Sequence, residues 1–178
     1  TKTFSYSKLN LEVKHLANAL LGAGVKKGDA VGIYLPMIPE VVISLLACFK
    51  IGAVAVPVFS GFGPEALRVR LADAEAKVLI TADGAYRRGK MISIKPNADQ
   101  AIQDLKNFKA QIVVKRTGSE VEWKAGRDLW WHEVLPYHSP SCGTYPVDSE
   151  HPCMILYTSG TTGKPKGCVH THAGALAQ

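Results

Sequence analysis

Short, continuously apolar segments alternate with amphipathic helical segments along most of this chain, and this alternation limits the folds that it can adopt. Strands that are apolar on both faces are typical of a mostly parallel sheet that is covered by helices on each side. The expected helices are residues 7–21, 39–52, 64–75, 96–108 and a short one near 129–135, and the expected strands are residues 31–35, 53–58, 77–81, 111–115 and 154–157. The sequence therefore predicts a doubly wound α/β fold, in which ligands usually bind beyond the carboxyl ends of the strands.

The first helix shows the local signals behind these assignments. Its apolar face is expected to consist of Leu9, Val13, Leu16 and Leu20, which recur at three- and four-residue steps. Ser7 is expected to cap its start, and Gly22 and Gly24 are expected to end it. Pro39 suits the first turn of the second helix, because a proline at that position removes no helical hydrogen bond.

Composition narrows the class of protein. Hydrophobic residues make up 47% and charged residues 20% of the 178 residues, which is ordinary for a folded domain. The net charge of +6 suits an anionic partner, but Lys and Arg form no runs with interleaved aromatic residues, so no nucleic-acid partner is expected. No stretch of about 18 apolar residues and no signal peptide occur, so no membrane partner is expected. The cysteines, which form no CxxC pair or zinc-like spacing, indicate reduced thiols in a cytoplasmic protein: Cys48, Cys142, Cys153 and Cys168.

The segment from Tyr157 to Gly167 carries the strongest chemical signal. Four hydroxyl residues, three glycines and two lysines fall within ten positions after a predicted strand. Glycines let backbone N–H groups approach an anion, hydroxyls donate further hydrogen bonds, and lysines supply positive charge. The candidate phosphate-binding residues are Thr158, Ser159, Gly160, Thr161, Thr162, Gly163, Lys164 and Lys166, the last of which could instead brace the loop.

This loop is not a Walker loop or a dinucleotide-binding turn. A Walker loop needs Gly where Thr158 stands, and Ser or Thr where Pro165 follows Lys164. Pro165 also disfavours helical geometry at Lys164, so no helix is expected to begin there. The alternative is a flexible surface turn, which the density of phosphate-compatible groups disfavours.

The string from Thr158 to Gly167 resembles the signature loop of the adenylate-forming superfamily. Further segments, spread along the whole chain, resemble its acetyl-CoA synthetase branch: residues 34–40, 59–67, 80–84, 126–132 and 148–150. The resemblance implies that residues 1–178 are part of an N-terminal adenylation domain, with the remainder and a C-terminal domain beyond this chain. On that basis no residue of the chain is certain to be catalytic, and we expect the chain alone to be inactive.

The resemblance also implies a reaction in two halves. A short-chain carboxylate, acetate or propionate, attacks the α-phosphorus of Mg²⁺-bound ATP to give acyl-AMP and pyrophosphate, and the thiol of CoA then displaces AMP. ATP, Mg²⁺ and CoA are therefore the expected small-molecule partners. Positioning and charge stabilisation matter more in the first half than a general base.

Two further segments are implied to contact CoA. In the basic turn at residues 86–90, Arg87 and Lys90 correspond to positions that approach the 3′-phosphate of CoA, although relatives often carry Arg where Lys90 stands. Gly61 and Gly63 flank Phe62 in a turn that is implied to lie near the pantetheine path. The alternatives are a solvated basic turn and an ordinary tight turn.

Other functions stay open. The acid could be a medium-chain or aryl acid, or the chain could belong to a non-catalytic nucleotide-binding module. His170 and His172 are expected on alternate positions of a strand, but two histidines without a third ligand make a poor metal site, so no metal-binding residues are assigned. The oligomeric state does not follow from the sequence.

Overall fold

The computed structural model describes residues 3–159 and 163–177, and within them seven strands form one sheet. The strand order is β7-β6-β3-β1-β2-β8-β9, and every pairing is parallel except that of β8 with β9. The strands of this sheet are β1 (Ala30–Ile33), β2 (Val54–Pro57), β3 (Val78–Ala82), β6 (Ala110–Val114), β7 (Asp128–Trp130), β8 (Pro152–Thr158) and β9 (Lys166–Thr171). Strands β4 (Gly84–Arg87) and β5 (Lys90–Ser93) form a separate antiparallel hairpin.

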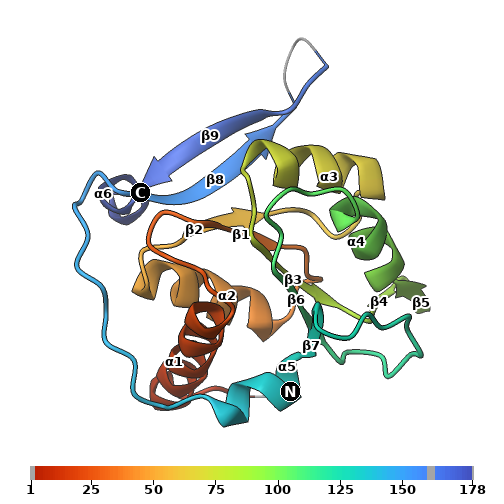
Figure 1. The fold of residues 1–178 in the computed structure, drawn as a ribbon, viewed down its shortest axis with the longest axis horizontal. Helices are drawn as coiled ribbons and strands as arrows, with labels where there is room; N and C mark the ends of the chain where they lie inside the picture. The colour runs from red at the N-terminus through yellow and green to blue at the C-terminus, as the bar shows by residue number, and fades with distance from the viewer. Residues whose placement is uncertain (1–2, 160–162, 178) are drawn as a thin grey trace.

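Helices cover both faces of the large sheet (Figure 1). They are α1 (Tyr6–Gly22), α2 (Pro39–Lys50), α3 (Pro64–Asp73), α4 (Lys95–Ile102), α5 (Trp131–Val134) and α6 (His172–Leu176), with a 3₁₀ turn at Leu135–Tyr137. One core contains α1, α2 and α5, and the other contains α3 and α4. Side chains alternate between them along a strand, so that Val78 and Ile80 belong to the first core and Leu79 to the second. The predicted doubly wound α/β fold is therefore confirmed.

Local details of the prediction are wrong at three places. Ser5, not Ser7, caps α1, because its hydroxyl accepts a hydrogen bond from the Lys8 N–H at 3.2 Å. The fourth helix ends at Ile102 rather than at residue 108, because the chain turns there towards β6 and Asn107 has a φ of +61°. The segment near residues 129–135 begins as a strand, β7, before it forms the short helix α5.

The hairpin of β4 and β5 is absent from the sequence prediction. Its two loop residues, Arg88 and Gly89, both have positive φ, as a type I′ turn requires. Arg-Gly is not the usual Asn-Gly or Asp-Gly signal for such a turn, which is why the segment read only as a basic turn.

Four ionic side chains tie α4 to β7. Lys95 Nζ lies 2.8 Å from Asp99 Oδ2 and 2.9 Å from Asp128 Oδ2. Arg127 contacts the same two carboxylates, at 2.6 Å and 2.5 Å respectively. The side chains of Lys95 and Asp128 are fully buried, so this cluster joins elements that are 33 residues apart inside the protein.

None of the helices in the described residues has the length and apolar character needed to cross a lipid bilayer.

Candidate active site

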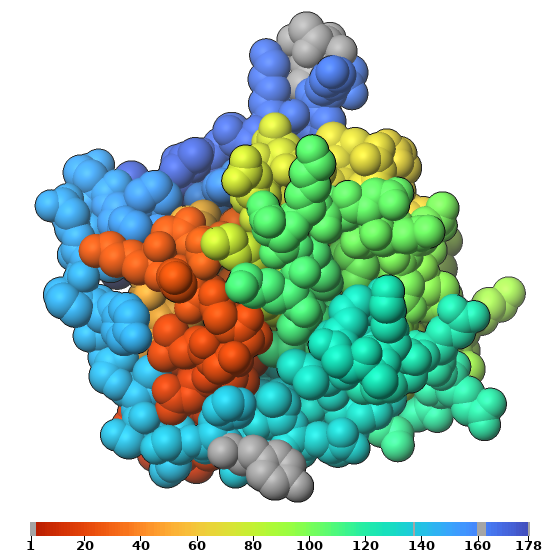
Figure 2. Space-filling view, viewed as in Figure 1, coloured from red at the N-terminus to blue at the C-terminus, as the bar shows by residue number. Residues whose placement is uncertain are grey.

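The predicted phosphate loop joins β8 to β9. These strands are antiparallel, and Thr158 at the end of β8 pairs with Lys166 at the start of β9. The hairpin stands out from the body of the molecule beside α3, as Figure 2 shows in blue. The described members of the loop are all exposed: Thr158, Ser159, Gly163, Lys164 and Lys166. Gly160, Thr161 and Thr162 lie outside the described residues.

The strand that follows the loop agrees with one part of the sequence analysis. Lys166 begins β9, and no helix begins at Lys164, as expected from Pro165. The described hydroxyls and lysines are therefore offered to solvent by an extended hairpin and not by a helix N-terminus. Such a hairpin can supply N–H, hydroxyl and ammonium donors to an anion, but no helix dipole.

Helix α3 anchors the base of this hairpin. The Tyr157 hydroxyl donates a hydrogen bond of 2.5 Å to Asp73 Oδ2, and the Arg70 guanidinium lies 5.9 Å from the Tyr157 ring. Burial, followed by the hydrogen bond and charge of Asp73, raises the pKa of the Tyr157 hydroxyl above its usual range. Tyr157 therefore stays neutral and holds the start of the loop against α3. Sequence reasoning missed Asp73 and Arg70, because nothing local marks them as partners of Tyr157.

A cavity of about 420 Å³ opens at the carboxyl ends of β1 and β2. The segments that line it come from residues 33–37, 57–61 and 85–92, together with Val41 of α2 and Leu156 of β8. Gly61 and Arg87, two of the four residues expected to contact CoA, both line this cavity. Leu156 lies two residues before Thr158, so the cavity and the phosphate loop share one strand.

The other two predicted CoA residues lie beside the cavity lining rather than in it. Lys90 pairs with Arg87 across the β4–β5 hairpin, so both cations stand at the exposed tip of that hairpin. Gly63 is the N-cap residue of α3, one position before Pro64. The structure therefore brings Gly61 and Arg87 together, with Lys90 close to Arg87 and Gly63 at the end of the same turn as Gly61.

Aromatic packing shapes the turn at residues 59–62. A Cβ atom on Gly61 would overlap the Phe59 ring, so this position requires glycine as long as the ring lies there. Phe59 packs edge-to-face on Phe62 at 5.6 Å, and the Arg87 guanidinium lies 6.0 Å from the Phe59 ring. The buried Tyr34 hydroxyl donates a hydrogen bond of 2.6 Å to the carbonyl of Phe62. Tyr34 thus holds the turn from its buried side, a role for which the sequence carries no signal.

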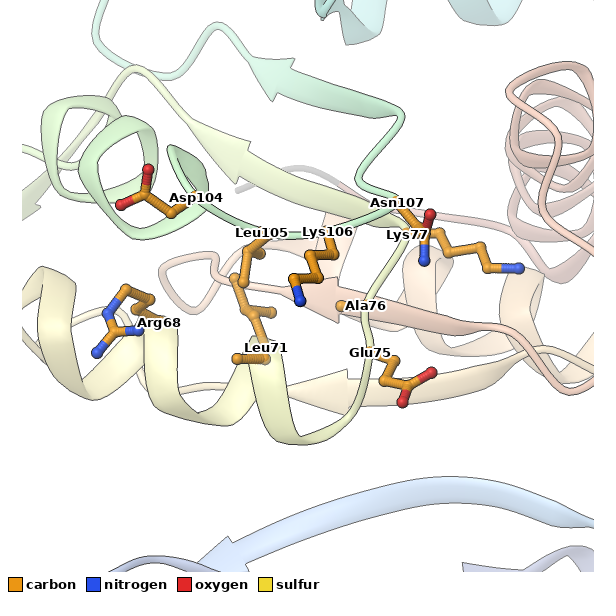
Figure 3. Close-up of a pocket in the computed structure, with 10 residues that line it drawn as sticks. Arg68, Leu71, Glu75, Ala76, Lys77, Asp104, Leu105, Lys106 and Asn107 are labelled. Atoms are coloured by element: carbon orange, nitrogen blue, oxygen red, sulfur yellow. The ribbon is translucent and has the colours of Figure 1, made fainter.

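A second cavity, of about 340 Å³, lies at the opposite ends of the strands (Figure 3). Its lining includes Arg68 and Glu75 from the α3 region, Lys77 just before β3, and Asp104 and Lys106 from the turn after α4. Residues of both charge signs line this hollow, and none of the residues singled out from the sequence lines it. We therefore place the candidate site at the carboxyl ends of the strands.

The two histidines do not share a strand face. His170 lies on β9, whereas His172 begins α6, so the expectation of alternate strand positions is wrong. The His172 ring packs against Phe49 at 5.7 Å and stacks on His151 at 6.1 Å. Across residues 3–159 and 163–177, no three His, Cys, Asp or Glu side chains are grouped so as to hold a metal ion.

Comparison with known proteins assigns the family. A family model described as "AMP-binding enzyme" matches residues 1–178. The chain belongs to the AMP-binding enzyme family. Among its relatives are proteins named acetyl-coenzyme A synthetase from Streptomyces avermitilis, 51% identical over 178 residues, and from Rubrobacter xylanophilus, 53% identical over 175 residues.

A solved structure carries the same fold. The acetoacetyl-CoA synthetase from Streptomyces lividans superposes on 98% of the chain with a TM-score of 0.90 and 31% sequence identity. This AMP-binding family chain spans 27% of the length of each of the two sequence relatives and 26% of that solved chain. The family resemblance read from residues 158–167 is thereby confirmed.

Proposed function

We propose that the protein containing this chain is an acid–thiol ligase, which uses ATP to convert a short-chain carboxylate, acetate or propionate, into acyl-AMP and pyrophosphate and then transfers the acyl group to CoA. The observation that carries this proposal is that identity of 51% to a protein named acetyl-coenzyme A synthetase extends over all 178 residues. Both the phosphate loop and the cavity at the carboxyl ends of the strands fall within the matched region.

In this proposal the hairpin of β8 and β9 binds the phosphates of ATP. Substitution at the α-phosphorus places negative charge on the departing pyrophosphate, and fixed N–H, hydroxyl and ammonium donors stabilise that charge. Thr158, Ser159, Gly160, Thr161, Thr162, Gly163 and Lys164 supply these donors, with Lys166 beside Thr158. Mg²⁺ prefers phosphate and carboxylate oxygens and keeps several waters, so it would neutralise charge on ATP without a ligand cluster in this part of the chain.

The cavity between Gly61 and Arg87 is proposed to receive CoA. A mainly apolar cavity suits the uncharged pantetheine arm, and Gly61 allows the Phe59 ring to pack against the turn that lines it. Arg87 and Lys90, which are both exposed at the hairpin tip, would bind the 3′-phosphate. Lysine at position 90 offers a point charge instead of the two-pronged grip of arginine.

The decisive experiment for the reaction is carboxylate-dependent ATP–pyrophosphate exchange by the full-length protein, with acetate, propionate, butyrate, octanoate and benzoate. Exchange with acetate or propionate supports the proposal. Exchange with only the larger acids would retain the chemistry and change the substrate to a medium-chain or aryl acid. A folded protein that binds ATP but exchanges with none of these acids would be a nucleotide-binding module, and the proposal would fall.

Two matched pairs of variants test the residue assignments. We expect Lys164→Ala to lower exchange by about tenfold or more, because a charged donor is lost near the leaving group, whereas Lys106→Ala on the far side should not change it. Similarly, Arg87→Ala should raise the KM for CoA, whereas Arg88→Ala, one residue along the same hairpin, should not. Equal effects within either pair would contradict the assignment.

Residues 1–178 by themselves are proposed to be inactive. Acyl-AMP formation by this piece would refute that proposal. A cytoplasmic location is also proposed, because Cys48, Cys142, Cys153 and Cys168 are all free thiols, and cell fractionation tests it.

A further inference from the structure

Asp83 occupies the junction between β3 and the β4–β5 hairpin, and it is fully buried. Its Oδ1 accepts hydrogen bonds from the backbone N–H groups of Gly84 at 2.7 Å, Arg116 at 2.8 Å and Thr117 at 3.0 Å. Its Oδ2 accepts from the backbone N–H groups of Thr117 at 3.1 Å and Gly118 at 2.7 Å. One carboxylate therefore gathers four backbone donors from two segments that are more than 30 residues apart.

The backbone of Asp83 closes the base of the hairpin as well. Its carbonyl accepts hydrogen bonds from Ile94 N at 3.2 Å and Lys95 N at 3.4 Å, where the chain leaves β5, and its own N–H donates to the Val114 carbonyl at 3.0 Å. Both ends of the hairpin and the segment that follows β6 therefore meet at this residue. A two-stranded hairpin of four residues per strand is marginally stable alone, so these bonds at its base add to the packing of Ala85 and Ile92 against the core.

The segments that Asp83 joins carry the charges of the proposed CoA site. The β4–β5 hairpin bears Arg87 and Lys90, and Arg87 lines the cavity. From the other segment, the Arg116 guanidinium lies 5.8 Å from the ring of Tyr86, which lines the same cavity. A shift of the hairpin relative to residues 116–118 would move Arg87 away from the cavity mouth.

We propose that Asp83 is a positioning residue for CoA: it locks the β4–β5 hairpin to residues 116–118 and so holds Arg87 at the mouth of the cavity. This inference rests on the proposed function. A carboxylate is required because both of its oxygens accept hydrogen bonds and neither donates one. An asparagine in its place would turn an NH₂ group towards N–H donors in either orientation of the amide.

The test uses the full-length protein with Asp83→Asn, and it measures the two half-reactions separately. We expect the apparent KM for CoA in thioester formation to rise by about tenfold, while acetate-dependent ATP–pyrophosphate exchange, which needs no CoA, stays within about twofold of the wild type. The matched control is Asp104→Asn, the same change at an exposed position on the far side, which should alter neither. A KM for CoA within twofold of the wild type, or an equal loss in both half-reactions, would overturn the proposal.

A double-mutant cycle separates positioning from general destabilisation. If Asp83 acts by holding the two cations of the hairpin, adding Asp83→Asn to Arg87→Ala/Lys90→Ala should raise the KM for CoA far less than it does in the wild type, because neither proposed phosphate contact is left to misplace. Additive effects would contradict the proposal.

Gly118→Ala supplies a milder perturbation if Asp83→Asn does not fold. Gly118 has a φ of +74° and open space around its Cβ position, so alanine strains only the backbone that donates to Asp83. It should raise the KM for CoA by a smaller factor and leave exchange unchanged, and an unchanged KM would count against the proposal. Absence of exchange in the wild-type protein with every acid would instead remove the proposed function itself.

Discussion

Replacement of Asp128 by asparagine should weaken the protein around β7. The Lys95 ammonium is fully buried and lies 2.9 Å from Asp128 Oδ2. At an effective dielectric constant of about 20, a pair of unit charges at that separation attracts by about 6 kcal/mol. Much of this attraction offsets the cost of removing both ions from water, so the net value of the intact pair is small, whereas an ion left without its partner keeps the full cost.

The expected loss of stability depends on the ion pair with Asp99 that Lys95 retains. Loss of one partner from a buried pair costs about 3–5 kcal/mol, and the lower end applies here because Asp99 remains 2.8 Å from the ammonium. We expect Asp128→Asn to lower the free energy of opening of β6 and β7 by about 3 kcal/mol. Hydrogen exchange of the backbone amides in Ala110–Val114 and Asp128–Trp130 measures this locally in the full-length protein, as a loss of protection of roughly 100-fold.

Two comparisons make this prediction refutable. The exposed Asp104→Asn change should alter the same protection by less than about 0.5 kcal/mol. Because Lys95 and Asp128 act as a pair, Lys95→Met combined with Asp128→Asn should cost less than the sum of the two single changes. A cost below about 1 kcal/mol for Asp128→Asn, or strict additivity with Lys95→Met, would refute the reasoning.

Three further outcomes follow from burial and close packing. Gly32→Ala would place a Cβ against two fully buried leucine side chains and should destabilise the protein by about 1–3 kcal/mol in urea denaturation; an unchanged midpoint would contradict the packing of β1 against α3. Burial raises the pKa of the Asp83 carboxyl, but the backbone N–H groups of residues 117, 116, 118 and 84 outweigh it, so the net pKa is lowered. The stability that Asp83 contributes is therefore complete above its pKa in the unfolded chain, about 4, and is lost as the pH falls through its lower pKa in the folded protein. Asp83→Asn should flatten this acid dependence of the unfolding midpoint. Burial also raises the pKa of the Cys48 thiol to about 12, so iodoacetamide at neutral pH should label the exposed Cys168 and spare Cys48, as peptide mass spectrometry would show.

Much of the fold is readable from local pattern. Each predicted strand of the large sheet overlaps an observed one, because a run of apolar residues bounded by turn signals reflects burial on both faces. The phosphate loop is predicted in the same way, since glycines, hydroxyls and lysines that are consecutive in sequence must lie together in space. The predicted boundaries are wrong where contacts with a distant element set the end of a helix or strand. The end of α4 is set by the return of the chain to β6. The Arg88–Gly89 turn closes a hairpin whose base is held by residues 116–118.

The arrangement of the candidate site, by contrast, is a product of the tertiary structure. Strand order brings the turn after β2, the β4–β5 hairpin and β8 to one end of the sheet, and so places Gly61, Arg87 and Leu156 around one cavity. The sequence by itself determined the fold class and the family and predicted the phosphate loop, because periodicity and motifs are local properties of a chain. Only the tertiary structure decided which distant groups Asp83 and Tyr157 bind beside the candidate site. Their partners are 33 to 84 residues away, and a single sequence carries no record of which distant groups meet.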